Sequence, residues 1–284
     1  AGYQPVILEQ GAPMEERVAD VEAFWQEQRL DESSNIQFGE GGAGTFSDGK
    51  LMTRINDGFC RVVLEEFVAH GAPKEILTAA KPHIGTDLLR KVVVAIRQEI
   101  VAMGGEVRFH TAAEDIITDN GKLFGIIANG EEIPCNCLIL APGNAARPLF
   151  TCSMERGIAM EAKPFSVGAR IEHLQEDINK GLYGEYYSHP HLPVGEYQLS
   201  YRDGERGVYT FCMCPGGFVV PSCSEENTVV TNGMSEFSRN QKNANAALVV
   251  SVSPQDYGTH PLDGVRFQRL LERRAFELGG GDYS

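Results

Sequence analysis

The spacing of apolar residues predicts three helices in the first part of the chain. Apolar side chains recur every three or four positions, as in Val18, Val21 and Trp25, and this is the period of one helix face. The predicted helices cover residues 15–29, 58–70 and 86–103. Thr86 is the expected N-cap of the third helix, which ends at Gly104. A short apolar run over residues 5–8 predicts a buried strand that ends at Glu9.

Residues 107–143 predict short strands instead. The pairs Asn120-Gly121 and Asn129-Gly130 separate apolar runs, and Asn-Gly is the strongest local signal for a tight hairpin turn. A further apolar run over residues 137–141 predicts a buried strand of the parallel type, ended by Pro142-Gly143.

From about residue 150 to residue 258 the pattern predicts a mainly antiparallel sheet. The expected strands cover residues 167–172, 196–201, 207–214, 218–220, 228–231 and 247–252. Asp203-Gly204 and Asn232-Gly233 are the expected turns, and residues 266–278 predict an amphipathic helix.

Composition narrows the class of protein and its partners. The 284 residues are 42% hydrophobic and 23% charged, as in an ordinary globular chain with a large core. The net charge of −14 argues against nucleic acid and anionic membranes as partners, because both would repel it. No signal peptide or membrane span is visible. Seven cysteines in a chain of this size suggest free thiols and a cytoplasmic location.

Glycines are concentrated in the stretch NIQFGEGGAGTFSDGKLMTR, residues 35–54. Glycine adopts positive φ and lets a ligand approach the backbone, so successive N–H groups of such a loop can form an anion cradle. Thr45, Ser47, Asp48 and Lys50 lie among these glycines. The alternative is a flexible linker, and the loop lacks the GxxxxGK[ST] spacing of a P-loop. The interleaved polar residues favour a ligand-binding loop.

Several motifs give the whole chain a family resemblance. They are GEGGAGTFSDGKL (39–51), PHIGTD (82–87), LAPGNAA (140–146), SVGARIEH (166–173), FCMCPGG (211–217) and NGMS (232–235). In these motifs the chain resembles bacterial FAD-dependent dehydrogenases, NAD(P)/FAD-dependent oxidoreductases with a glutathione-reductase-type fold. The resemblance implies an α/β fold: a Rossmann-like FAD-binding domain (1–150), an inserted, mainly antiparallel β substrate domain (151–260), and a return to the FAD domain (261–284).

The resemblance also implies a cofactor site built from several segments. The expected FAD-binding residues are Glu9, Gln10, Arg17, Gly41, Gly42, Ala43, Gly44, Thr45, Phe46, Ser47, Asp48, Gly49, Lys50, Ala113, Ala141, Pro142, Gly143 and Asn144. Glu9 would bind ribose hydroxyls, and Arg17 could reach a phosphate. The alternative is that Glu9 merely ends a core strand. Family members more often carry Thr in place of Pro142, and proline removes that backbone donor.

The flavin fold is expected to be incomplete in these residues. The GxGxxG turn that precedes the ribose-binding acid in a dinucleotide-binding unit is absent. Related proteins also continue, after residues 279–281, with a last flavin-contacting strand and helix. We therefore expect these residues to be a piece of a longer protein.

Lys50 and Cys214 are the catalytic candidates. Lys50 could favour the anionic reduced flavin, or it could be an ordinary surface lysine. Cys212 and Cys214 alternate on a predicted strand, so both thiols should point to one face, near the flavin N5 or a substrate, or else act as small buried hydrophobes. Together with Cys135 and Cys137 they could count as four zinc ligands, but C-x-C spacing is not typical of structural zinc, and no metal site is expected.

The resulting hypothesis is an FAD-dependent oxidoreductase. It would transfer a hydride between FAD and a small organic substrate of unknown identity, with NAD(P)H as a candidate reductant. No second GxGxxG indicates a separate pyridine-nucleotide domain. The alternatives are an FAD-binding protein with a structural or redox-sensing role, and a fragment unable to hold flavin. The sequence does not indicate the oligomeric state.

Overall fold

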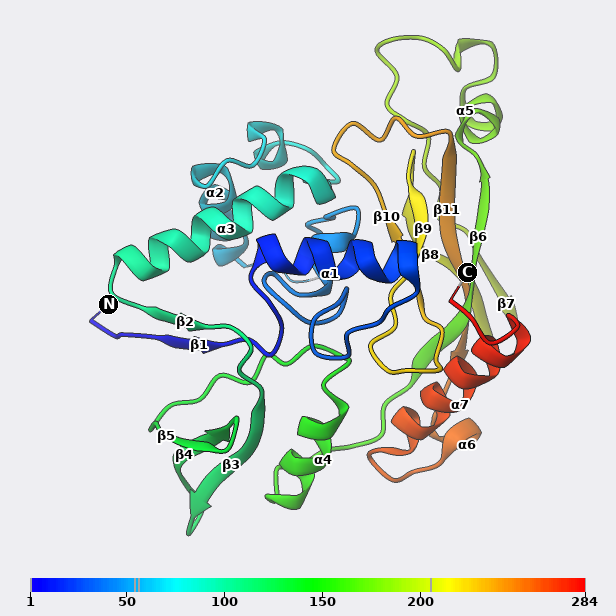
Figure 1. The fold of residues 1–284 in the computed structure, drawn as a ribbon. Coiled ribbons are helices and arrows are strands. Elements are labelled where there is room, and N and C mark those ends of the chain that lie inside the picture. The colour runs from blue at the N-terminus through cyan, green and yellow to red at the C-terminus, as the bar shows by residue number, and fades with distance from the viewer. Residues whose placement is uncertain (1, 54, 56, 205, 284) are drawn as a thin grey trace.

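The computed structural model describes residues 2–53, 55, 57–204 and 206–283, and Figure 1 shows their mixed α/β arrangement. The strands are β1 (Val6–Leu8), β2 (Glu106–Arg108), β3 (Ala113–Asp119), β4 (Lys122–Ala128), β5 (Glu131–Pro134), β6 (Phe165–Leu174), β7 (Ser200–Asp203), β8 (Arg206–Cys214), β9 (Phe218–Pro221), β10 (Thr231–Met234) and β11 (Asn243–Val252). The helices are α1 (Met14–Glu27), α2 (Phe59–Ala69), α3 (Thr86–Ala102), α4 (Arg147–Glu155), α5 (Gln175–Tyr183), α6 (Pro254–Tyr257) and α7 (Asp263–Leu278). Short 3-10 turns cover Ala43–Phe46, Lys74–Leu77 and Gly184–Tyr186.

The first half contains two small sheets and the three predicted helices. β1 pairs in parallel with β2, so that Ile7 lies opposite Val107. β3, β4 and β5 form an antiparallel meander, and its turns at Asn120-Gly121 and Asn129-Gly130 confirm the hairpin prediction. Strand β1 is where the sequence predicted it, but the expected burial is wrong, because Val6 and Ile7 are exposed on this two-stranded sheet.

The second half is dominated by an antiparallel sheet, as predicted. Its strand order is β6-β11-β8-β7, and β9 and β10 form a separate antiparallel pair. β6 and β11 pair over their full ten residues. The β8–β11 register shifts between Asn245 and Ala247, so that Cys212 and Met213 lie in a β-bulge.

A buried cluster joins the two halves of the chain. Val21 of α1 and Ile36 and Phe46 of the glycine-rich region pack against Val220 of β9 and Met234 of β10. Figure 1 shows α1 reaching from the β1–β2 side toward β9 and β10. The glycine-rich loop therefore lies at the junction of the two halves, and the proposed domain boundaries at residues 150 and 260 remain a prediction.

The start of α3 differs from the prediction. The N-cap is Gly85, not Thr86, and its φ is 79°. A Cβ atom at Gly85 would lie 2.1 Å from the backbone nitrogen of Phe237, so only glycine allows this approach. The Thr86 hydroxyl donates to the Thr45 carbonyl at 2.7 Å, and its N–H donates to the Ser235 carbonyl at 3.0 Å. Thr86 thus ties the glycine-rich loop to the β10 segment.

Three strand predictions differ from the structure. The strand expected over 196–201 begins only at Ser200, as β7, and residues 196–199 are irregular. Residues 137–141 are irregular, and the Ile139 side chain is 87% exposed; an apolar run forms a buried strand only where neighbouring strands flank it. Asn232-Gly233 lies inside β10 and is not a turn, so the strand expected over 228–231 is displaced toward Met234. Gly233 suits this strand because a Cβ there would lie 2.4 Å from Arg170 Nη1.

Candidate functional site

Arg17 supports the glycine-rich loop from inside the protein. Its side chain is fully buried, and its guanidinium makes five hydrogen bonds to backbone carbonyls of residues 35–42. The acceptors are the carbonyls of Asn35, Ile36, Gly39, Glu40 and Gly42. Since a guanidinium has five N–H donors, the expected contact of Arg17 with a phosphate is wrong: its donors already serve the loop.

Two carboxylates fix the beginning of the same loop. Glu9 Oε1 accepts the N–H groups of Gly11 at 2.9 Å and Gly39 at 2.8 Å. Glu40 accepts the Met14 N–H at 2.7 Å and Arg97 Nε at 2.6 Å. Glu9 thus connects the end of β1 to the loop, and whether it also binds a ribose remains a prediction.

The middle of the loop has a buried side and an open side. The Thr45 and Phe46 side chains are fully buried, and the Phe46 ring packs beneath the guanidinium groups of Arg17 and Arg90. A cofactor could therefore meet the backbone of Thr45 and Phe46 but not their side chains, and their place in the cofactor site remains a prediction.

The open side lies at Gly42 and Gly44. A Cβ atom built at either glycine would meet nothing within 4 Å. Ala43 lies between them, whereas a Cβ at Gly41 would lie 2.3 Å from Thr45 Oγ1, so Gly41 is closed on that side. Ser47 closes its end locally, because its hydroxyl donates to the Gly44 carbonyl and accepts the Gly49 N–H. The loop thus presents backbone to the outside at the residues expected to cradle a ligand.

Asp48 anchors the end of the loop to the C-terminal half. Its buried carboxylate accepts two hydrogen bonds from Arg239, at 2.9 and 2.5 Å, and one from the Ser235 hydroxyl. Lys50 Nζ lies 3.8 Å from Asp48 Oδ2. Asp48 is therefore a structural anchor whose oxygen atoms have protein partners.

Lys50 connects the loop to strand β8. Its ammonium group donates to the Met213 carbonyl in the bulge. From strand β6, which is separated from β8 by β11, Arg170 Nη1 donates to the Cys212 carbonyl at 3.1 Å and to Asn245 Oδ1 at 2.6 Å. The glycine-rich loop and the FCMCPGG motif, which are far apart in sequence, thus meet in one polar cluster, defined here by Lys50, Arg170, Cys212, Cys214 and Asn245 and called the thiol cluster.

The two thiols of this cluster differ sharply in acidity. The neighbouring Cys214 thiol, together with the charges of Lys50 and Arg170, lowers the pKa of Cys212. The pKa of Cys214 is raised, because of the neighbouring Cys212 and because its thiol is buried. Cys214 is fully buried, whereas Cys212 is partly exposed. The role expected of Cys214 stays a prediction, whereas the partial exposure of Cys212 and the cations beside it are properties of a nucleophilic thiol.

The other expected cofactor residues lie in two further segments of the chain. The N–H of Thr111 donates to the Glu9 carbonyl at 2.9 Å, which brings the start of β3 at Ala113 toward Gln10. Ala141, Pro142 and Gly143 lie in the irregular segment before α4. A Cβ at Gly143 would meet nothing within 4 Å, so this backbone is also open.

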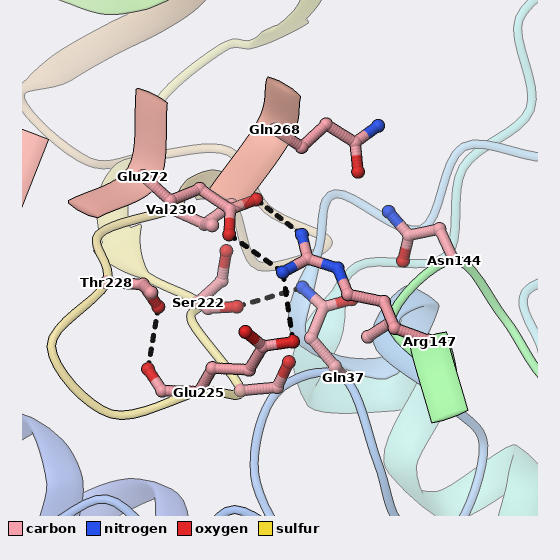
Figure 2. A pocket seen from close by; sticks show the side chains of 11 residues that line it. Gln37, Asn144, Arg147, Ser222, Glu225, Thr228, Val230, Gln268 and Glu272 are labelled. Atoms are coloured by element: carbon pink, nitrogen blue, oxygen red, sulfur yellow. Dashed lines mark hydrogen bonds and ion pairs between the residues drawn. The ribbon is translucent and has the colours of Figure 1, made fainter. Parts of the chain in front are cut away.

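Asn144 lines a polar cavity of about 100 Å³ next to Gln37, shown in Figure 2. Arg147 lies at its centre and donates to both oxygens of Glu272, at 3.0 and 2.6 Å. It also lies 3.0 Å from Glu225 Oε1. These two carboxylates compensate the charge of the buried guanidinium, although its Nε has no hydrogen-bond partner. With two carboxylates around one guanidinium, the cavity does not favour an anion.

Sequence reasoning missed several residues of the thiol cluster and of the Asp48 anchor. Arg239 and Asn245 carried no signal. Ser235 lay within the NGMS motif, and Arg170 within SVGARIEH, but neither motif indicated what its side chain would contact. Contacts between residues so far apart in sequence follow from strand pairing, which the sequence pattern does not specify.

Two further searches of the structure concern metal sites and membrane-spanning helices. Within the described residues, no group of three or more His, Cys, Asp or Glu side chains is placed to hold a metal ion, so the four cysteines considered as zinc ligands are not brought together. Among the helices that the structure describes, none combines the length and apolarity needed to cross a bilayer.

Comparisons with known proteins add a family match for the C-terminal part. Residues 164–284 match the family described as "FAD-dependent protein, C-terminal domain-like". A protein of Clostridium beijerinckii named "Uncharacterized protein" is 50% identical over 285 residues, which are 99% of this chain and 54% of that protein. The chain therefore spans about half the length of this curated relative. Its antiparallel half is similar to the C-terminal domain of FAD-dependent proteins.

Likenesses to solved structures are weak. CtdE in complex with FAD has a TM-score of 0.30 and 13% identity, over 87% of this chain and 59% of that one. An oxidoreductase from Methanosarcina mazei has a TM-score of 0.30 and 15% identity, over 93% of this chain and 53% of that one. A mutant of the halogenase PltM in complex with FAD has a TM-score of 0.32 and 12% identity, over 72% of this chain and 35% of that one. Scores of this size carry no conclusion about function.

Proposed function

We propose that this chain is part of an FAD-dependent oxidoreductase that transfers a hydride between FAD and a small organic substrate or NAD(P)H. The match of residues 164–284 to an FAD-dependent protein family supports the cofactor class. The observation that carries the assignment to the loop is its open backbone at Gly42 and Gly44, next to buried anchors on the other side. A ligand can approach this loop closely, because buried side chains hold one side of it and no side chain covers the backbone on the other side.

The loop has uncovered backbone donors of the kind that hold such a cofactor. The N–H groups of Gly41, Ala43 and Gly44, and the backbone at Gly143, are the candidates to hold it, since no atom lies within 4 Å of a Cβ built at Gly44 or Gly143. The Gly42 N–H already donates to the Gly39 carbonyl at 2.9 Å. Bound FAD would supply hydride acceptance and donation. Arg17 acts indirectly, by holding the carbonyls of the loop inward so that its shape is kept.

The chain's own charged groups would orient and stabilise the reactants. The Lys50 ammonium lies where the loop meets the bulge of β8, and the buried Asp48 carboxylate lies 3.8 Å from it. A cation in this place stabilises negative charge that develops beside the loop. Arg239 holds Asp48 and thereby leaves the Lys50 charge incompletely compensated.

The test is FAD binding by the full 284-residue chain with a bulky residue on the open side. Gly44→Leu should weaken FAD binding at least tenfold, because the side chain fills the space in front of the loop. Gly44 needs no positive φ, so the substitution causes little backbone strain. Titration of FAD, followed by flavin fluorescence, measures the change.

Gly58→Leu is the matched control. Gly58 is also exposed, has a helical φ of −59°, and would meet nothing within 4 Å, but it lies at the start of α2 outside the loop. It should bind FAD as the unaltered chain does. Equal binding by both variants would contradict the assignment to the loop, and binding without reduction by NAD(P)H or any organic reductant would argue against hydride transfer.

A further inference from the structure

We propose that Cys212 and Cys214 form a redox-active dithiol that exchanges with low-molecular-weight disulfides, with Cys212 as the attacking thiol and Cys214 as the resolving thiol. This activity goes beyond the proposed function and needs no FAD. It rests on the geometry of the β8 bulge, on the charges that surround Cys212, and on the different exposure of the two thiols.

The bulge brings the two thiols together. Cys212 has φ of 46°, in the left-handed region that non-glycine residues rarely adopt, and the β8–β11 register shifts at this point. The Cys214 thiol donates to the Cys212 backbone carbonyl at 3.6 Å, and each thiol influences the acidity of the other. Unusual backbone of this kind is held in place by its surroundings and is concentrated at functional sites.

The surroundings favour a thiolate on Cys212 rather than on Cys214. The charged groups that act on the pair are Lys50 and Arg170 at Cys212, and Asp48 and Arg170 at Cys214. Two cations beside Cys212 favour its ionised form, whereas the Asp48 carboxylate disfavours ionisation of Cys214. Burial, in contrast, raises the pKa of Cys135, Cys152 and Cys223.

Access to the pair is also one-sided. Cys212 is partly exposed and Cys214 is buried, so a small disulfide meets Cys212 first. Behind Cys214 lies Gly233, where a Cβ would come within 2.7 Å of the Cys214 sulfur. The buried thiol is therefore packed against β10, on the side away from solvent.

The exchange balances in two steps. The Cys212 thiolate attacks one sulfur of a disulfide RSSR, forming a mixed disulfide and releasing RS⁻. Cys214 then loses its proton to a released thiolate, its sulfur attacks Cys212 Sγ, and the second RS⁻ leaves. The protein dithiol is oxidised by two electrons to a Cys212–Cys214 disulfide, and RSSR is reduced to two thiols.

The test uses the reduced 284-residue chain and oxidised glutathione at about pH 7. Acid quenching, alkylation and peptide mass spectrometry should show a Cys212–Cys214 disulfide, with two hydrogens lost from the peptide and two glutathione molecules released per chain.

Cys214→Ser should instead accumulate one glutathione on Cys212. Cys212→Ser should give neither product at Cys214. Lys50→Met should slow the first step about threefold or more, since a lost cation raises the thiol pKa.

Cys137→Ser is the control, because Cys137 is an exposed thiol of the other C-x-C pair, and it should leave the yield unchanged. Native folding of each variant is checked by the fluorescence of Trp25. The proposal is overturned if natively folded Cys214→Ser gains no glutathione on Cys212, or if Cys212 in the unaltered chain reacts no faster than Cys137.

Discussion

Arg17 is a buried charge whose partners are backbone carbonyls of a single loop. Burial lowers its pKa to about 10, so the side chain stays protonated at neutral pH, and its donors hold residues 35–42. Arg17→Met keeps much of the volume but leaves these carbonyls without a donor. We expect a loss of about 3 kcal/mol or more in the free energy of unfolding, measured by urea denaturation.

Arg29→Met provides the comparison for this prediction. The Arg29 side chain is largely exposed, and its ion pair with Glu27 spans 3.9 Å, so its removal should change stability by less than about 0.5 kcal/mol. Equal losses in both variants would mean that Arg17 does not organise the loop.

The residue types indicated where the backbone of the loop is open, but they did not indicate what the side chains around it contact. The glycine content of residues 39–50 indicated an open backbone, and Gly42 and Gly44 are open. The sequence could not show that Arg17 and Asp48 face inward, because their partners come from carbonyls and from Arg239. Likewise, spacing cannot distinguish two thiols whose acidity depends on Lys50 and on burial.

Among the elements, those with local signals were predictable. Helices α1, α2, α3 and α7 follow from helical spacing, and the β3–β5 turns follow from Asn-Gly pairs. Elements that depend on their neighbours were not. Residues 137–141 have a strand-like composition without a flanking strand, and the bulge at Cys212 depends on its pairing with β11.

The contact between α2 and α3 should depend on pH. His70, at the end of α2, lies 2.7 Å from the Glu66 carbonyl through Nδ1 and contacts Glu99 of α3 through Nε2. The Glu66 hydrogen bond first, and then Glu99, raise the pKa of His70. Because the folded pKa is raised, this contribution is complete below the ordinary value of about 6.5 and is lost as the pH rises through the folded value.

His70→Gln should therefore cost more stability at about pH 5.5 than at about pH 9, by no more than about 1 kcal/mol for a contact so near solvent. Urea unfolding at the two pH values measures the difference. Glu99→Gln, which removes only one of the two partners, should give a smaller difference of the same sign. A loss that is constant with pH would show that His70 acts only through packing.

The two halves of the molecule should unfold together. Phe46 and Val21 of the first half and Val220 and Met234 of the second share one core, and the single tryptophan, Trp25, packs against Phe46 and donates to the Pro221 carbonyl at 3.3 Å. Trp25 fluorescence and far-UV circular dichroism should therefore report the same midpoint.

Phe46→Ala tests this coupling. Removing a fully buried ring should lower the free energy of unfolding by about 3 to 5 kcal/mol, and both midpoints should fall together. Phe59→Ala removes a ring that is 76% exposed, so the free energy of unfolding should change by less than about 0.5 kcal/mol. Separate transitions in the unaltered chain would show that the halves are independent.

The segment from Cys135 to Ala146 has a consequence for handling the molecule. It carries no charged side chain, it belongs to no sheet over residues 137–141, and Ile139 and Leu140 face the solvent. Uncharged, apolar backbone without strand partners is a template for pairing between copies. The net charge of −14 makes copies of the chain repel one another. When the protein is concentrated, we nevertheless expect aggregation to begin at this uncharged segment.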